Sequence, residues 1–536
     1  MARRAFSRLS KSPRATRSKS RRSLDTPPWV GRQVKKRNFS QRDTFHVLPQ
    51  IKMTPERQNE GGISELPRLR KGVSLSAVFA IRFLAAVFLS PILAFAAPAP
   101  FGIRVIDEAT GDGVPLAEVR TVNDISFITD NAGWVAFQES GLMEREIFLH
   151  IASPGYEHPK DGFGFRGVRL VAKAGESTTV KMKRINIAQR IGRLTGGGLF
   201  RDSELLGKAT LLPNASPVLG QDSVQGVRYN GGLFFLWGDT NVPRYPLGNF
   251  HTTAATLPAD AHPSRSLAYR YFTEADGLRK MLPIQGPGAA WMFGLLTLRG
   301  DDGRDILLSG FSIHRSLAER IQQGVARFDD AKGTFTVIAE MGKDEPWRTP
   351  RGVAVQHEGY IYFAAPFLHT RVPAKLADIT NPASYEAYWL DPATKSGRWQ
   401  REHGPTTEPL TTPEDKEIRL HTGSVKWNAW RKRWLFIGVQ SGGKNDPSAL
   451  GEVWYAESPS PEGPWGRAVK IASHPRYTFY NPVHHDFFDT DDGKTIWFEG
   501  TYTKEFSGNP TPTPRYDYNQ LMYRLDLASP ALAPAH

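Results

Sequence analysis

The chain has 536 residues, with 68 Lys or Arg, 54 Asp or Glu and no Cys, and its formal net charge at pH 7 is +14. The lack of Cys excludes disulfides, cysteine nucleophiles and thiolate metal sites. The basic charge is confined to residues 1–82, which hold 20 Lys or Arg and 5 Asp or Glu, so that 48 basic and 49 acidic residues remain for the rest. The bulk of the chain is therefore close to neutral, and we expect no nucleic-acid partner.

The front of the chain, residues 1–72, is rich in Arg and Ser and poor in apolar residues, which predicts a disordered basic extension. Residues 73–97 have the features of a signal peptide, because basic residues precede the apolar run 83–95, which leads into an Ala-Phe-Ala cleavage site. A membrane anchor is the alternative, but it needs about 20 apolar residues, and Arg82 and Pro91 interrupt the run. We expect a secreted or periplasmic protein with no stable membrane insertion after cleavage.

Residues 99–185 alternate apolar and polar side chains between Gly, Asp and Pro turns, which predicts a small antiparallel β-sandwich. From Ile103 to Tyr156 the sequence runs Ile-x-Val-x-Asp, Gly-x-x-Val-Pro-x-Ala-x-Val, Thr-Asp-x-x-Gly-x-x-x-Phe and Ser-x-Gly-Tyr. This order of motifs resembles the carboxypeptidase regulatory-like, or transthyretin-like, domain. The resemblance implies an accessory module, and we find no catalytic cluster in it.

A hairpin of two short apolar runs recurs five times after residue 185, with copies that begin at Gly231, Gly303, Gly359, Lys432 and Gly493. The spacing fits one four-stranded blade for each copy and predicts a five-bladed β-propeller over 186–528, so that the fold class is all-β. Because a circular array leaves an exposed edge unless it closes, we expect residues 186–194 to supply the outer strand of the last blade. The Ala- and Pro-rich end, 529–536, is predicted to be a disordered tail.

Two carboxylates flank the first of these hairpins. Asp222 precedes one strand and Asp239 follows its partner, so antiparallel pairing brings both to the same end of the hairpin. If that end faces the propeller axis, the pair flanks a common centre, as glycoside hydrolysis requires of its proton donor and its base or nucleophile. The alternative is that Asp239 only caps a turn.

The segment Trp237-Gly-Asp-Thr240 resembles the first blade of the five-bladed propeller glycosidases of the arabinanase and xylosidase superfamily. The resemblance is strongest to the endo-D-arabinanase-like branch, with its Phe-Gly-Asp-Thr-like motif, and it implies that Asp222 and Asp239 are the acid and the base. The Trp-x-Asp-Pro motif that opens the first blade of xylosidase-type families occurs here only in mid-array, at 389–392. The family within the superfamily therefore stays open.

Further polar and aromatic residues stand at the ends of predicted strands. Glu499, in the fifth hairpin, is predicted as a third catalytic carboxylate. The residues expected to bind substrate by stacking or hydrogen bonding are Trp237, Tyr245, Arg348, His421, Trp427, Glu452, His484 and His485. A purely structural role is the alternative for the histidines.

These patterns predict an exported glycoside hydrolase that cleaves a polysaccharide or oligosaccharide with a carboxylate pair, as a monomer and without cofactor or metal. The run Asp489-Thr-Asp-Asp-Gly493 resembles a calcium loop superficially, but it lacks the spacing and the final Glu of an EF-hand. The alternative function is a non-catalytic propeller that binds glycan or protein at the cell surface, because one fold hosts both kinds of function.

Overall fold

The computed structural model describes residues 99–196, 201–212, 218–243, 245–249, 251–275, 277–286, 288–316, 319–391, 393–394, 396–441, 450–515 and 517–535. The predicted extension and signal peptide lie outside these ranges. What is described consists mainly of β-strands, and the predicted all-β fold class is confirmed. Within the same ranges, no helix has the length and apolar character that crossing a membrane would take.

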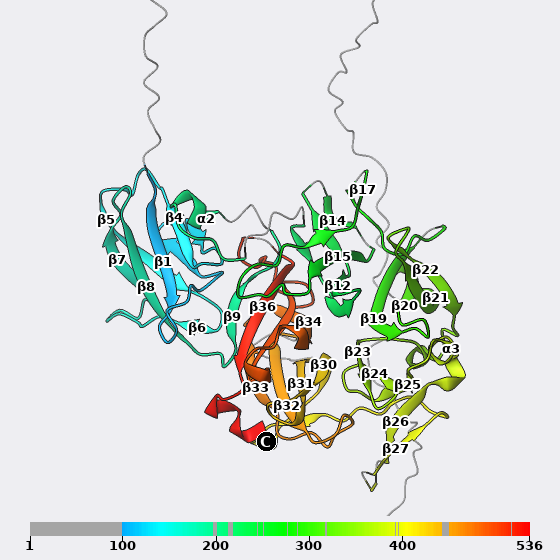
Figure 1. Ribbon diagram of the computed structural model, residues 1–536. Coiled ribbons are helices and arrows are strands. Elements are labelled where there is room, and N and C mark those ends of the chain that lie inside the picture. Colours follow the sequence, from blue (N-terminus) through cyan, green and yellow to red (C-terminus); the bar gives the residue numbers. More distant parts are fainter. Residues whose placement is uncertain are drawn as a thin grey trace, which may run out of the picture. The chain divides into compact units, whose positions relative to one another are not determined.

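The first eight strands form a β-sandwich of two four-stranded sheets (Figure 1), with the orders β4-β1-β8-β6 and β3-β2-β5-β7. Their bounds are β1 Phe101–Asp107, β2 Glu118–Thr121, β3 Ser126–Ile128, β4 Trp134–Phe137, β5 Glu146–Ala152, β6 Tyr156–Glu157, β7 Gly167–Val171 and β8 Ser177–Arg184. Side chains such as Ile103, Val105 and Leu149 are fully buried in one shared core. The sandwich is not wholly antiparallel as predicted, because β8 returns from the second sheet to pair parallel with β1.

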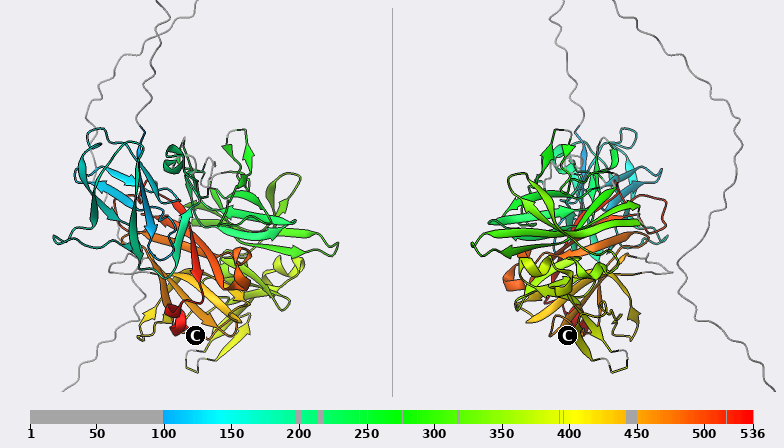
Figure 2. Two further views of the ribbon diagram at one scale, coloured as in Figure 1. Left: turned by 60° about the vertical axis from the view of Figure 1, so that its left-hand side comes forward. Right: turned by 90° about the vertical axis from the view of Figure 1, so that its right-hand side faces the viewer.

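Five further sheets of antiparallel strands form the blades of the propeller, and Figure 2 shows them from two further directions. The first blade comprises β11 Gln225–Tyr229, β12 Gly232–Trp237, β15 Thr253–Pro258 and β16 Arg270–Tyr271. The second comprises β19 Ala289–Arg299, β20 Asp305–Ser316, β21 Glu319–Asp329 and β22 Thr334–Glu340. The third comprises β23 Val353–His357, β24 Tyr360–Ala364, β25 Thr370–Pro373, β26 Glu386–Leu390 and β27 Gly397–Gln400. The fourth comprises β30 Leu420–Asn428, β31 Arg433–Gln440, β32 Glu452–Ser458 and β33 Val469–Ser473. The fifth comprises β34 Thr478–His484, β35 Thr495–Thr503, β36 Asn519–Asp526 and, at its edge, β9 Gln189–Arg193.

Short elements complete the connections between the blades. Small sheets join β10 Gly220–Gln221 to β13 Thr240–Val242 and β14 Tyr245–Asn249, β17 Thr273–Glu274 to β18 Gly277–Leu278, and β28 Leu410–Thr411 to β29 Glu417–Ile418. The helices within the described ranges are all short: α2 Asp202–Leu205, α3 Leu376–Ile379, η1 Pro346–Arg348, η2 Pro382–Ser384, η3 Asp486–Phe488, η4 Asp491–Gly493 and η5 Pro530–Ala535.

The ring closes through β9, which pairs antiparallel with β36 at the edge of the fifth blade. The prediction that residues 186–194 supply this strand is confirmed. Hydrogen bonds also join innermost strands of neighbouring blades, for example from Gln225 Nε2 to the carbonyl of Met292. The fifth and first blades are joined by Asn481 Nδ2, which donates to Ser223 Oγ at 2.7 Å.

The innermost strands β11, β19, β23, β30 and β34 contact one another around the ring. Their N-terminal ends share one face of the propeller, which we name the proximal face, and their C-terminal ends share the distal face. Residues at the proximal face include Asp222, Trp291, Arg351, His421 and Tyr480, and residues at the distal face include Arg228, Trp427 and His484.

The closing strand is anchored in the sandwich by a buried cation. Arg190 of β9 is 2 % exposed, and its guanidinium donates to the carbonyl oxygens of Pro115 and Pro154 and to Ser153 Oγ. A buried charge is stable only when its donors are satisfied, and here three sandwich oxygens satisfy them.

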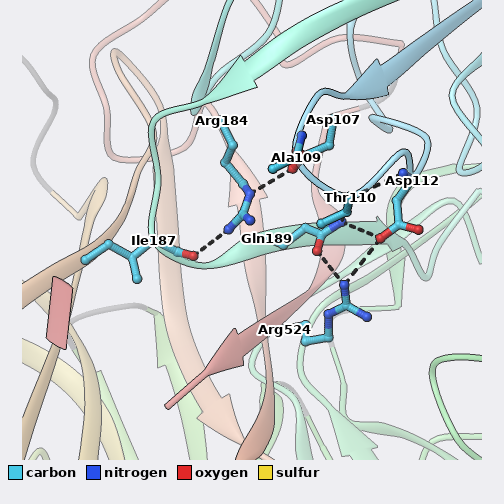
Figure 3. Close-up of polar contacts among 8 residues, drawn as sticks. All are labelled: Asp107, Ala109, Thr110, Asp112, Arg184, Ile187, Gln189 and Arg524. Carbon is cyan, nitrogen blue, oxygen red and sulfur yellow. Dashed lines mark hydrogen bonds and ion pairs between the residues drawn. The ribbon is translucent and has the colours of Figure 1, made fainter. Parts of the chain in front are cut away.

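Further polar groups, from buried Asp107 and Gln189 to half-buried Arg184, lie around this anchor, as Figure 3 shows. Arg184 pairs with Asp107 at 2.8 Å, and Asp112 accepts from Gln189 at 2.9 Å and lies 3.3 Å from Arg524 of β36. The strand that closes the propeller is thus also the strand that the sandwich holds.

The predicted disordered tail is wrong for residues 530–535, which form η5. Leu532 and Ala535 are fully buried in the cluster that also contains Leu435 and Leu527. The physical reason is that the apolar side chains of Leu532 and Ala535 pack against β32 and β33 of the fourth blade, although the segment is too poor in β-formers to add a strand.

Candidate active site

Asp222 and Asp239 lie opposite each other at the proximal end of the first hairpin. The Asp222 amide donates to the carbonyl of Asp239 at 3.1 Å, and the Gly238 amide donates to the carbonyl of Asp222 at 2.8 Å. The pairing of β11 with β12 and of β10 with β13 also sets Asp222 opposite Asp239. This register sets the two residues opposite each other, and the charge of Asp222 acts on the Asp239 carboxyl.

Asp222 is held by two tyrosines of the fifth blade. Tyr480 Oη donates to Asp222 Oδ2 at 2.7 Å, and Tyr518 Oη donates to the same oxygen. Tyr480 belongs to β34 and Tyr518 directly precedes β36, so closure of the ring brings both to the first blade. Two hydroxyl donors on one oxygen stabilise the ionised carboxylate.

The backbone after Asp222 is strained and fixed by neighbours. Ser223 has a φ of 55°, a left-handed conformation that is rare for residues other than glycine. Its amide donates to Thr501 Oγ1 at 3.4 Å, and its hydroxyl accepts from Asn481 Nδ2. Strain of this kind persists only where the surrounding structure imposes it, and it concentrates at functional sites.

Among the described residues, Asp239 accepts fewer side-chain hydrogen bonds than Asp222. Its Oδ1 accepts from Trp291 Nε1 of the second blade at 3.2 Å. Burial, and then the charge of Asp222, raise the pKa of Asp239 to about 6. Burial also raises the pKa of Asp222, against the opposing hydrogen bonds from Tyr518 and Tyr480. The pair can therefore hold or release a proton under mildly acidic conditions.

Gly238 allows the close approach of the two strands at this site. A Cβ atom at this position would lie 2.2 Å from Asp222 Oδ1. Any side chain here would collide with the carboxylate, which explains the glycine in the Trp237-Gly-Asp-Thr240 segment.

Glu499 does not join the pair. It is 0 % exposed, and its Oε2 lies 3.3 Å from Nε2 of His485, whose ring packs against Phe235 of the first blade. The prediction of a third catalytic carboxylate is wrong for this structure, because no substrate reaches an enclosed group. The cause is the length of β35: Glu499 lies in mid-strand, whereas Asp239 lies beyond the end of β12.

His484 and His485 are both buried, so the predicted contact with substrate is wrong for both. His484 ends β34 at the distal face, and its Nε2 lies 2.9 Å from Asp489 Oδ1. Their contacts support the alternative, a purely structural role for these two histidines. Asp489 belongs to the run that resembled a calcium loop, and no group of three His, Asp or Glu in the described part of the chain is placed to hold a metal ion.

Arg348 and Glu452 contact residues of the outer strands and loops of their own blades. Arg348 lies over the ring of Trp347 at 4.1 Å and donates to the carbonyl of Pro382 at 3.2 Å. Glu452 is 2 % exposed and pairs with Lys470 of β33 at 2.9 Å. Both side chains thus form ion pairs within their own blades, and their predicted role in binding substrate stays a prediction.

The predicted aromatic platforms are also not at the acid pair. Trp237 is 1 % exposed, and its ring lies 5.1 Å from that of Tyr269 in the core, so that no ring face is open to a sugar. Trp427 is 47 % exposed but lies near the distal end of β30. The predicted stacking role is therefore wrong for Trp237, and that of Trp427 stays a prediction, at the face opposite to the aspartates.

His421 and Tyr245 remain near the proximal face. His421 lies at the start of β30, where partial burial lowers its pKa. Tyr245 starts β14, and its backbone pairs with Val242 of β13, three residues beyond Asp239. Their roles in binding substrate stay predictions.

The sequence interpretation missed Tyr480, Tyr518 and Trp291. Tyr480 lies in the same strand as His484 but nearer its N-terminal end, which is the proximal end. That position could have identified Tyr480 in the sequence. Trp291 is the third residue of β19, close to the start of an innermost strand. No local pattern marks Tyr518, since it meets Asp222 only through ring closure.

A separate cavity of about 310 Å³ lies toward the distal face. Its lining includes Arg228, Phe487 and the ion pair of Lys426 with Asp486, whose charged atoms are 3.2 Å apart. None of the predicted site residues lines it, so it forms no part of the acid pair's surroundings.

No family model matches the sequence, and no curated protein matches it. Among solved structures, the chain is similar to an exo-1,5-α-L-arabinanase from a bovine ruminal metagenomic library, at 9 % identity and a TM-score of 0.34, over 58 % of this chain and 95 % of that one. An exo-β-1,3-galactanase from Phanerochaete chrysosporium matches at 10 % identity and a TM-score of 0.33, over 60 % and 64 %. An endo-arabinanase from Bacillus licheniformis matches at 8 % identity and a TM-score of 0.31, over 57 % and 93 %. Likenesses of this size assign no activity to the chain, which has to be argued from its own residues.

Proposed function

We propose that this protein is a glycoside hydrolase-like propeller that cleaves a polysaccharide or oligosaccharide by acid–base catalysis. The observation that carries the proposal is the pairing of Asp222 with Asp239 at the proximal end of the first hairpin, in two different environments. Hydrolysis of a glycosidic bond needs two carboxyl groups, one to protonate the leaving oxygen and one to activate water or attack the sugar.

The environments divide these two roles. Asp222 accepts hydrogen bonds from two phenols, which favour its ionised form, so it is the base or nucleophile. Asp239 has one indole donor and a pKa raised to about 6, so it keeps its proton in mild acid and is the general acid. This division follows the rule that neighbouring carboxyls in unlike surroundings take opposite roles.

Export and an accessory role for the sandwich belong to the same proposal. The basic and apolar segments before residue 98 support secretion, and a polymeric substrate outside the cell would require it. In this view Tyr480, Tyr518 and Trp291 are positioning residues, while His421 and Tyr245 contact the sugar.

The test is release of reducing ends from a panel of arabinans, xylans and algal glycans by the purified chain, beside Asp239→Asn. We expect at least one glycan to be cut, and Asp239→Asn to lower the rate by about 100-fold or more. Turnover that survives Asp239→Asn would contradict the acid role. A glycan that is bound but never cut would instead support the non-catalytic propeller.

A further inference from the structure

We propose that the substrate carries an acidic substituent, a carboxylate or a sulfate on a sugar unit, which Arg351 and Arg320 bind at the proximal face beside the acid pair. This inference rests on the proposed function and names its substrate class. That class is an acidic polysaccharide, in place of a neutral arabinan or xylan.

The backbone of Arg351 is fixed against the second blade by three glycines. A Cβ atom on Gly294 would lie 2.4 Å from the Arg351 amide nitrogen, and one on Gly310 would lie 2.1 Å from the Pro350 carbonyl oxygen. The Gly294 amide donates to the carbonyl of Gly352 at 3.0 Å, and Gly352 has a φ of 58°. The chain thus lies directly on β19 and β20 just before β23 begins, which preorganises Arg351.

The guanidinium of Arg351 is not paired with a carboxylate among the described residues. In the part of the chain that the structure describes, no carboxylate forms an ion pair with it, and the acid nearest before it in the sequence, Glu345, pairs with Arg348 at 3.0 Å. Burial, and then the charge of Arg320, lower the pKa of Arg351. A guanidinium stays charged in proteins nonetheless, so the two arginines repel each other.

Arg320, at the start of β21, is satisfied only in part. Its Nη2 donates to the carbonyl of Lys343 at 3.0 Å, and its Nε is buried without a partner. The adjacent Glu319 pairs with Arg315 instead. The charge of Arg320 acts on Arg351, and no ion pair with an acid is formed by either side chain among the described residues.

A row of contacts connects these arginines to the acid pair. Trp291 donates to Asp239, its ring centroid lies 4.4 Å from that of His314, and His314 is in register with Arg320 across β20 and β21. The pKa of Asp239 is set by burial, Asp222 and Trp291, without a contribution from either arginine. Neither arginine is thus a partner of Asp239, and both remain available to a substituent on the substrate.

The chemistry of the two side chains selects an oxyanion. Like charges in a partly buried place destabilise each other, so an anion between them gains free energy from both. The planar guanidinium offers forked donors that match carboxylate and other oxyanions. A neutral sugar hydroxyl would leave the repulsion between Arg351 and Arg320 uncompensated.

The test is retention of the full chain by immobilised polygalacturonan, glucuronoxylan and carrageenan, each beside its own carboxyl-reduced or desulfated form. These paired forms separate a carboxylate from a sulfate ligand. Arg351→Gln is compared with Arg351→Lys, which keeps the charge but loses the fork, and with Arg304→Gln, which removes the same charge from an 85 % exposed side chain at the distal turn of the second blade. Circular dichroism verifies that each variant is folded.

We expect at least one acidic polymer to bind about 10-fold or more tightly than its neutral form. Arg351→Gln should weaken that binding by about 10- to 100-fold, Arg351→Lys by less, and Arg304→Gln not measurably. Raising the salt concentration should weaken it as well, because exposed charge pairs are screened.

Three results would overturn the acidic-substrate proposal: equal binding of acidic and neutral forms, no binding of any acidic polymer, or equal behaviour of Arg351→Gln and Arg304→Gln. Hydrolysis distinguishes this failure from failure of the proposed function. If a neutral glycan is cleaved in a way that depends on Asp239 but not on Arg351, the proposed catalytic pair stands and the acidic-substrate proposal fails. If an acidic glycan binds in a way that depends on Arg351 but no glycan is hydrolysed, the acidic-ligand proposal stands and the proposed enzymatic function fails.

Discussion

Tyr518 and Asp222, 296 residues apart in the chain, are joined by a hydrogen bond from the phenol to Oδ2. One belongs to the approach to β36 and the other to the loop before β11, so the bond exists only in the closed ring. The same closure depends on β9 at the edge of the fifth blade. The environment of the acid pair is therefore complete only when the propeller is closed.

Tyr518→Phe tests whether this bond holds Asp222 in its ionised form. Losing a hydrogen bond to a charged group should lower kcat/KM by about 10- to 100-fold. With one donor fewer, the pKa of Asp222 should be higher than in the wild type. The acidic limb of the pH profile of kcat/KM should therefore move to higher pH. Tyr385→Phe is the control, since it removes a buried phenol donor to the Ile379 carbonyl in the third blade. An unmoved acidic limb in Tyr518→Phe would contradict the assignment of the base.

Asp239→Asn should stabilise the protein at neutral pH. The folded-state pKa of Asp239 is raised from 3.8 to about 6, so above pH 6 the folded protein holds an ionised carboxylate in an unfavourable place. Replacement by Asn removes that cost, about 2 kcal/mol after allowance for partial exposure. Below pH 3.8 the carboxyl is protonated in both folded and unfolded states, so the difference should vanish.

Urea unfolding at pH 8 and at pH 3.5 measures this effect. Asp301→Asn, at an exposed position in the turn between β19 and β20, is the matched control and should change little at either pH. If Asp239→Asn is only as stable as the wild type at pH 8, the ionised Asp239 carboxylate does not destabilise the folded protein.

Gly238→Ala should damage the site more than the fold. The added methyl would meet Asp222 Oδ1, so the carboxylate has to move and the alignment needed for proton transfer is lost. We expect activity to fall by about 100-fold, with stability lowered by only about 1 kcal/mol. Gly141→Ala, where no atom lies within 4 Å of the added methyl, should change neither quantity. Wild-type activity in Gly238→Ala would place the reacting carboxylate elsewhere.

The architecture followed from the sequence because it depends on patterns that repeat. Five apolar hairpins at blade spacing predicted the ring, and the lack of a last strand predicted that residues 186–194 would return to close it. Pairing across one hairpin likewise predicted that Asp222 and Asp239 would meet, because turn and register are local properties.

The surroundings of the pair could not be predicted in the same way. Tyr518 and Trp291 reach the aspartates from other blades, and their contacts depend on how the blades pack around the axis. Glu499 was misplaced because the number of residues by which β35 extends beyond β12 is not visible in the hairpin motif. Trp237 was misjudged because an aromatic residue beside a catalytic motif looks the same in sequence whether it faces the core or the substrate.

Arg190→Met tests the coupling between ring closure and the sandwich. The variant removes the donors of three sandwich oxygens, Pro115 O, Pro154 O and Ser153 Oγ, which should lower the free energy of unfolding by about 3 kcal/mol. Activity should fall in parallel with unfolding of the ring, because Tyr518 then leaves Asp222. Arg169→Met, at a 67 % exposed side chain of the sandwich, is the control and should change stability by less than about 0.5 kcal/mol. Stability unchanged in Arg190→Met would mean that β9 holds without the sandwich.

The most direct measurement of the central claim is turnover and affinity on one cleaved glycan for the wild type, Asp222→Asn, Asp239→Asn and the double variant. If the two carboxyls act as one acid–base unit, each single change should lower kcat by about 100-fold or more, the double change should lower it little further, and the dissociation constant should stay near that of the wild type. A single variant that turns over at the wild-type rate, or losses that multiply in the double variant, would contradict the account.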